Sequence, residues 1–141
     1  MKSKLSRREL DWLVACELQE DWRRKTPHKT RPKRTTGQAW IEKNGTDTVD
    51  LVITIFPDLP LDWQAENFAS AIVANNLIED GVTDIEAASA KIHVEWLKRN
   101  FEHAEPAQKL DYDDPNFPED QRKLDRNVFR VALAINKKYQ A

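Results

Sequence analysis

The chain has 141 residues, with 22 Lys or Arg against 24 Asp or Glu and a net charge of −2. This length suits a single domain whose core is large enough to be stable without disulfides or structural metals. Its one cysteine, Cys16, excludes an intramolecular disulfide, and the chain begins without a signal-type segment, so we expect a reducing, cytoplasmic location. Apolar runs are only a few residues long, and we therefore expect no membrane partner.

Charge is distributed unevenly along the chain. Residues 1–43 hold twelve Lys or Arg against six Asp or Glu, whereas residues 44–141 hold ten against eighteen. Such an asymmetry bears on binding partners and not on the fold.

The first predicted element is a helix over residues 6–24. Ser6 and Glu9 have the spacing of a capping box, and apolar residues from Leu10 onward recur with helical periodicity. The following basic run, residues 23–34, contains seven Lys or Arg and two prolines. Proline disfavours regular structure, so an exposed loop is expected there.

A β-hairpin is predicted next. Residues 38–43 and 48–55 flank Asn44 and Gly45, a dipeptide that readily adopts positive φ in a tight hairpin turn, and the second flank is rich in Val, Ile and Thr. A lone hairpin is marginal in water, so this one is expected to pack on helices.

Residues 62–79 predict a second long helix. Asp62 is the expected N-cap, and Gly81 suits the left-handed position beyond the C-terminal end. The expected inward stripe consists of Phe68, Ala71, Ile72, Asn75 and Ile78.

Two more helices are predicted, over residues 83–101 and from Pro118 onward, joined by an acidic loop. Thr83 and Glu86 have capping-box spacing, and Pro118 is expected at the first position of the last helix. The inward residues are expected to be Ile85, Ala88, Ser89, Ile92 and Trp96 in the former, and Leu124, Val128, Val131, Ala132 and Ile135 in the latter. The whole predicts an α+β fold in one domain, mainly helical, with about four helices and one antiparallel β-hairpin.

The motif His93-x-x-Trp96-x-Lys98-Arg99, followed by the run Phe-Pro-Glu-Asp-Gln-Arg-Lys-Leu-Asp-Arg-Asn at residues 117–127, resembles the RyR domain. This small module of ryanodine receptors also occurs in bacterial and phage proteins. The resemblance covers residues 82–137 and leaves residues 1–80 of unrecognised type. It implies a helix–loop–helix unit that binds a small anionic, nucleotide-like ligand or a partner protein. Independently of the resemblance, we expect no enzymatic activity and no cofactor.

Within this motif Tyr112 supplies the aromatic residue of the loop, Phe117 stands where the family has leucine, and Leu124 stands where it has tyrosine. The last difference removes a phenol, together with any contact that the phenol makes.

His93 lies at the border of the inward stripe and can reach the last helix, where Asp125 or the region of Arg126 is the expected partner. We expect a buried histidine satisfied by a hydrogen bond, with Asp125 and Pro118 completing the structural motif. Contact with a ligand is an alternative. Metal binding is not predicted, because the chain has no pair of histidines at i and i+4 near this position.

Aromatic and basic side chains of the RyR-like region could hold a nucleotide-like ligand by ring stacking and phosphate pairing. Aromatic residues at helical spacing are, however, more often part of a core. The expected ligand-binding residues are Trp96, Lys98, Arg99, Tyr112 and Arg126.

The basic run supports a competing hypothesis, in which the protein binds DNA or RNA through phosphate contacts. Short basic loops are usually only solvated, and the acidic remainder of the chain would repel nucleic acid. The residues that would carry this function are Arg23, Arg24, Lys29, Arg31, Lys33 and Arg34.

Signatures of catalysis are missing from the sequence. Only three glycines are present, which excludes a glycine-rich phosphate loop, and neither Gly-x-Ser-x-Gly nor Cys-x-x-Cys occurs. Cys16 is expected to fill space in the core, and the adjacent Asp113 and Asp114 are expected to be solvated or to cap a helix. Oligomeric state is not determined by the sequence.

Overall fold

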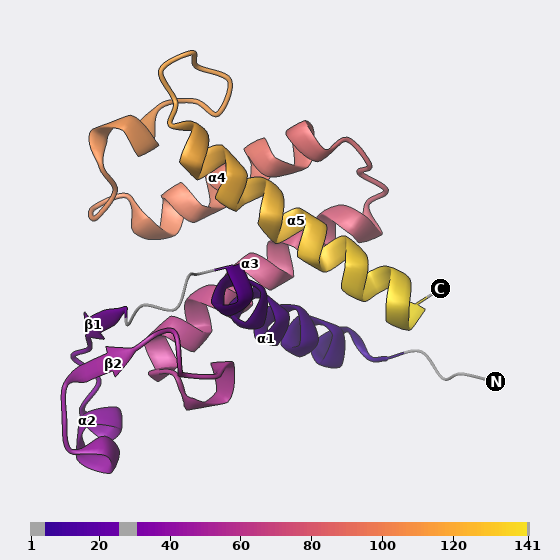
Figure 1. The fold of residues 1–141 in the computed structure, drawn as a ribbon. Coiled ribbons are helices and arrows are strands. Elements are labelled where there is room, and N and C mark those ends of the chain that lie inside the picture. The colour runs from indigo at the N-terminus through magenta and orange to yellow at the C-terminus, as the bar shows by residue number, and fades with distance from the viewer. Residues whose placement is uncertain (1–4, 26–30, 141) are drawn as a thin grey trace.

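The computed structural model describes residues 5–25 and 31–140 (Figure 1). Its elements, in chain order, are α1 (Arg7–Lys25), β1 (Pro32–Arg34), α2 (Gln38–Asn44), β2 (Thr48–Asp50), the 3-10 helix η1 (Phe56–Asp58), α3 (Leu61–Glu79), α4 (Ile85–Asn100), the 3-10 helix η2 (Pro106–Lys109) and α5 (Glu119–Gln140). The α+β class and the mainly helical character are confirmed, and the described residues hold five α-helices instead of about four.

The four long helices pack together, and the ribbon of β1 and β2 lies with α2 at one end of this assembly (Figure 1). Helix α1 contacts α3 and α5, and α4 contacts α5 and α3. Five buried alanines contribute small side chains to the common core, which allows neighbouring helices to approach closely: Ala15, Ala71, Ala74, Ala88 and Ala132.

Helix α1 begins where its capping box predicts. The Ser6 amide donates to Glu9 Oε1 at 3.0 Å, and the Glu9 amide donates to Ser6 Oγ at 3.2 Å. Both bonds satisfy amides that a helix N-terminus otherwise leaves without partners. Leu10 and Val14 then reach the core.

The predicted hairpin is wrong in its pairing. Residues 38–44 form α2, and Gly45, with φ of 72°, caps that helix in the left-handed conformation while its amide donates to the Ile41 carbonyl at 2.8 Å. A glycine with positive φ serves a helix C-terminus as well as a hairpin turn. Strand β2 instead pairs antiparallel with β1, which lies in the segment predicted to be a loop.

Strand β2 is also shorter than predicted, ending at Asp50 instead of Ile55. The ribbon is held against the helices by Val49, which is fully buried. Pro32 is tolerated in β1 because a two-stranded ribbon leaves an edge that needs no amide donor.

Helix α3 begins at Leu61 after Pro60, and no side chain caps it, so the prediction of Asp62 as N-cap is wrong. Asp62 lies instead in the first turn, where its charge is favourable to the helix dipole. Gly81 has φ of 80°, as expected beyond a helix end. Ile72, predicted to be inward, is 42% exposed.

Asn75 is the polar residue at the centre of the predicted α3 stripe, and it is 1% exposed. Its Nδ2 donates to Asp11 Oδ1 of α1 at 2.7 Å, and its Oδ1 accepts from Asn136 Nδ2 of α5 at 2.8 Å. A buried amide without partners would be costly, and these bonds satisfy it while connecting three helices.

Helices α4 and α5 begin within a residue or two of the predicted positions. Asp84, not Thr83, caps α4 by accepting from the Glu86 amide at 3.0 Å. Pro118 immediately precedes the first residue of α5. The predicted inward face of α5 is correct at Val131, but Leu124 is 55% exposed and does not belong to the core.

Candidate ligand site in the C-terminal unit

His93 lies on α4 with only 2% of its surface exposed. Its Nε2 is 2.7 Å from the carbonyl oxygen of Gln108 in η2. Because a carbonyl only accepts hydrogen bonds, Nε2 carries a proton and donates it. Nδ1 then faces Asp125 Oδ2 of α5 at 3.3 Å, so the contact that the sequence predicts is present.

This contact is one side of a closed ring of four residues. Asp125 Oδ1 accepts from Gln121 Nε2 at 3.1 Å, and Gln121 Oε1 accepts from Gln108 Nε2 at 3.0 Å. The ring, formed by His93, Gln108, Gln121 and Asp125, connects α4, η2 and α5. It fixes the start of the loop that joins the two helices.

The His93–Asp125 side of the ring requires a proton. Nδ1 and Oδ2 have no other hydrogen-bond partner among the described residues, and two lone pairs facing each other at this distance would repel. Burial lowers the pKa of His93, and burial raises the pKa of Asp125 to about 7. Both shifts favour the uncharged pair, in which the Asp125 carboxyl donates to Nδ1.

Aromatic side chains enclose the His93 ring. Trp96 stacks on it with centroids 5.6 Å apart, and Phe117 meets it edge-on at 4.6 Å. Tyr112 packs on Phe117 and is 5% exposed, with its hydroxyl donating to Glu86 at 2.7 Å. The aromatic side chains of the RyR-like region therefore form mainly the core of the C-terminal unit.

Both predicted ligand-binding arginines are paired with carboxylates, and the two pairings involve different residues. Arg99 contacts Glu66 of α3 at 3.0 Å. Arg126 contacts Glu86 at 2.7 Å and Glu119 at 2.8 Å. Neither lines the groove described below. Arg126 shares the Glu86 carboxylate with the Tyr112 hydroxyl, but neither arginine reaches the groove that Lys98 and Tyr112 line.

A groove of about 570 Å³ lies between α4 and the chain from η2 to Asp113. His93, Lys98 and Tyr112 line it, and Lys109 adds a second ammonium group, 4.3 Å from the centroid of the Phe101 ring. Its apolar lining comes from Ala90, Val94, Leu97, Phe101 and Leu110, and the carboxylates of Asp111 and Asp113 also border it.

Sequence reasoning did not identify Gln108, Gln121 and Arg122. Gln121 and Asp125 are four residues apart and so share a face of α5, a spacing that could have suggested the bond. Arg122 donates to the carbonyls of Tyr112 and Asp114 at 2.9 and 2.6 Å and holds the acidic loop against α5. No sequence pattern predicts bonds of this kind to a loop backbone.

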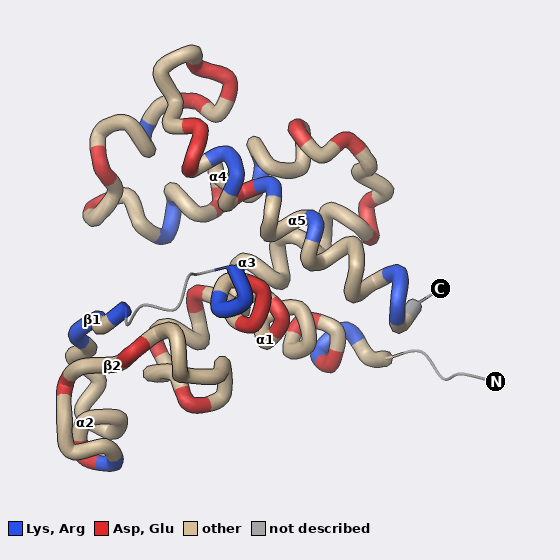
Figure 2. The backbone as a smooth tube through the Cα atoms, viewed as in Figure 1, with Lys and Arg blue, Asp and Glu red and all other residues tan. Residues whose placement is uncertain are grey.

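The basic residues proposed for nucleic-acid binding are largely engaged within the protein. Arg23 pairs with Glu20, Arg24 with Glu17 and Arg34 with Asp47, while Lys33 lies over the Trp63 ring at 4.7 Å. Arg31 is exposed, and Lys29 lies outside the described residues. Figure 2 shows basic positions at both ends of α1 and acidic positions between them.

Cys16 is partly buried and packs against the core, as expected. Burial, with help from Glu20 and Glu17, raises the pKa of its thiol, which makes it a poor nucleophile. Asp114 Oδ1 accepts from the Asn116 amide at 2.8 Å within the loop. Among the described residues, no cluster of three His, Cys, Asp or Glu is placed to hold a metal ion.

Comparison with protein-family models, curated proteins and solved structures gives no match to this chain. The resemblance of residues 82–137 to the RyR domain therefore stays a prediction. In the described part of the chain, no helix is both long enough and apolar enough to cross a membrane.

Proposed function

We propose that the protein is a non-enzymatic binding protein and that its C-terminal unit, residues 82–137, holds a small anionic ligand such as a nucleotide. The observation that carries the proposal is the groove beside α4, where an apolar floor meets two ammonium groups, Lys98 and Lys109. The resemblance to the RyR domain points to the same class of ligand.

The groove has the size and composition that such a ligand needs. Its volume of about 570 Å³ lies within the usual ~300–1,000 Å³ range for small-molecule sites. The exposed Phe101 ring offers a face for a flat base, and Lys98 is available because its exposed pair with Glu95 contributes little to stability. The carboxylates of Asp111 and Asp113 would repel an anionic group, so the anionic part of the ligand is expected next to Lys98 and Lys109.

A partner protein is the second candidate occupant, and one feature of α4 favours it. Ala90, Val94, Leu97 and Phe101 follow one another at intervals of four, three and four residues, the spacing of a seam that packs against another helix. Val94 is 48% exposed and Phe101 55% exposed.

Thermal denaturation and calorimetric titration with ATP, cyclic nucleotides and uncharged adenosine would test the proposal. We expect the nucleotides to raise the melting temperature and adenosine to bind more weakly. Lys98→Ala and Lys109→Ala should each weaken nucleotide binding about tenfold, equal to ~1.4 kcal/mol, because each removes one charge-assisted contact. Lys91→Ala, an exposed α4 residue outside the groove, is the matched control.

Equal loss of affinity in the Lys91→Ala control would contradict the proposal, as would the absence of any saturable nucleotide binding. The nucleic-acid hypothesis is tested separately by neutralising Arg31, Lys33 and Arg34 together. If that hypothesis is right, retention on DNA or RNA is lost while nucleotide-induced stabilisation is unchanged.

A further inference from the structure

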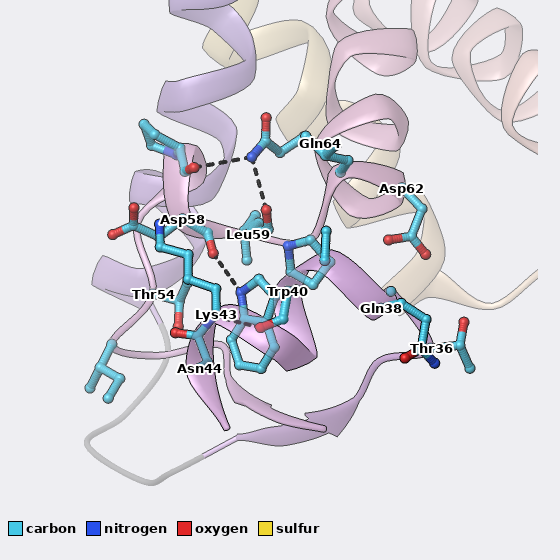
Figure 3. Close-up of a pocket in the computed structure, with 16 residues that line it drawn as sticks. Thr36, Gln38, Trp40, Lys43, Asn44, Thr54, Asp58, Leu59, Asp62 and Gln64 are labelled. Atoms are coloured by element: carbon cyan, nitrogen blue, oxygen red, sulfur yellow. Dashed lines mark hydrogen bonds between the residues drawn. The ribbon is translucent and has the colours of Figure 1, made fainter. Parts of the chain in front are cut away.

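A second cavity, of about 770 Å³, is formed by residues 36–64 and shares no residue with the groove beside α4 (Figure 3). Its walls are α2 with the loop before it, the loop after β2, η1 and the first residues of α3. Two stretches of the chain, residues 36–44 and 53–64, thus meet at one concave surface in the part of the chain for which the sequence suggests no function.

Side-chain bonds to the backbone hold these walls in place. Trp40 Nε1 donates to the Asp58 carbonyl at 2.9 Å, which fixes the indole against η1. Gln64 Nε2 donates to the carbonyls of Pro57 and Leu59 at 3.1 and 2.8 Å. Dashed lines in Figure 3 mark these bonds. A site with fixed walls loses little entropy when a ligand binds.

Four other polar side chains that line the cavity, those of Thr36, Gln38, Lys43 and Asp62, have by contrast no hydrogen-bond partner among the described residues. Figure 3 shows Thr36, Gln38 and Asp62 together on one side of Trp40, and Lys43 also lines the cavity. These four side chains provide a hydroxyl, an amide, a carboxylate and an ammonium group. They can therefore donate and accept hydrogen bonds around one aromatic ring.

Several classes of ligand fit the cavity and its polar side chains poorly. An anion would meet one ammonium group, Lys43, against the carboxylates of Asp58 and Asp62. An extended peptide binds by adding a strand to the edge of a sheet, but no residue of β1 or β2 lines this cavity. A wholly apolar ligand would leave the polar side chains without partners when it covered them.

We propose that this cavity binds a neutral saccharide. Each sugar hydroxyl both donates and accepts, so neighbouring hydroxyls can meet the Asp62 carboxylate and the Gln38 amide at once. The C–H face of a sugar ring is apolar and packs on an aromatic surface, which Trp40 supplies. This cavity is separate from the anionic-ligand groove, so a negative result for one binding proposal does not contradict the other.

The test is a titration of the isotope-labelled full-length protein with neutral mono- and disaccharides, followed by amide and indole NMR shifts. We expect saturable shifts at the Trp40 indole N–H and at the amides of Gln38 and Asp62. Gln38→Ala and Asp62→Ala should each weaken binding about tenfold, because each removes hydrogen bonds to hydroxyls. Glu42→Ala is the matched control, since Glu42 is exposed on the same helix but does not line the cavity.

Three results would overturn the proposal. The first is the absence of saturable shifts with any of the saccharides. The second is binding that Gln38→Ala and Asp62→Ala leave unchanged. The third is binding of peptides that depends on Ile53 and Leu61, which border the cavity at 72% and 75% exposure, because the cavity would then be an apolar contact surface for protein.

Discussion

Replacing His93 and replacing Asp125 should change the pH dependence of the protein's stability in opposite directions. In the unfolded chain His93 takes up its proton near pH ~6.5 and Asp125 near ~3.9. In the folded protein the pair holds one shared proton, released at about 7 according to the pKa of Asp125. Between about pH 5 and 6 the two states therefore bind equal numbers of protons, and the pair contributes almost no pH dependence.

Asp125→Asn leaves the histidine as the only titrating member of the pair, and the new amide can donate to Nδ1 as the protonated carboxyl does. Burial still lowers the pKa of His93, so between the lowered pKa and pH ~6.5 the unfolded chain binds up to one proton more than the folded protein. Relative to wild type, this variant should lose up to ~1.4 kcal/mol of stability for each pH unit below that point.

His93→Gln leaves only the buried carboxyl, whose raised pKa makes the folded protein bind more protons than the unfolded chain. Stability relative to wild type should then fall as pH rises from about 4 to 7, by up to ~1.4 kcal/mol per unit. Urea unfolding at several pH values measures both slopes, with the exposed His103→Gln as control. Slopes of the same sign in the two variants, or slopes parallel to wild type, would refute the shared proton.

Three further substitutions test other parts of the structure. Arg122→Ala removes two hydrogen bonds to loop carbonyls and should lower the free energy of opening the loop by ~1–3 kcal/mol. Amide hydrogen exchange across residues 110–117 should therefore become faster in Arg122→Ala but stay unchanged in Lys123→Ala. Phe129→Ala should destabilise the protein by ~3–5 kcal/mol in urea unfolding because this ring is fully buried, and Leu133→Ala, at 38% exposure, should cost much less. Gly45→Ala should lower the melting temperature through a cost of about 1 kcal/mol, since its φ of 72° disfavours a Cβ; an unchanged melting temperature would contradict the assigned helix cap.

Local signals in the sequence predicted the four long helices well but not α2, because the start of a long helix depends on residues three positions apart. The pair Ser6 and Glu9 is an example, and its two bonds are present in the structure. Gly45 was misassigned because positive φ is needed by a hairpin turn and by a helix end alike, so the local signal does not distinguish them. What decided between them was the pairing of β1 with β2, a contact between distant segments.

The candidate site was predictable only in part. The contact between His93 and Asp125 could be predicted from the inward faces of two amphipathic helices. The hydrogen bonds of Gln108, which close the ring of four residues, depend on how the loop folds back and could not be predicted. Leu124 occupied a regular apolar position and yet lies 55% exposed, because periodicity indicates a face and not what covers it.

The bonds of Asn75 have a consequence for how uniquely α1, α3 and α5 are aligned. Apolar side chains tolerate small slides between helices, whereas this amide must meet Asp11 and Asn136 at the same time. Shifting any of the three helices by one turn would move a partner about 5.4 Å away and leave a buried amide unsatisfied. Replacing the trio by leucines could raise the melting point while permitting several competing alignments, a trade of specificity for stability.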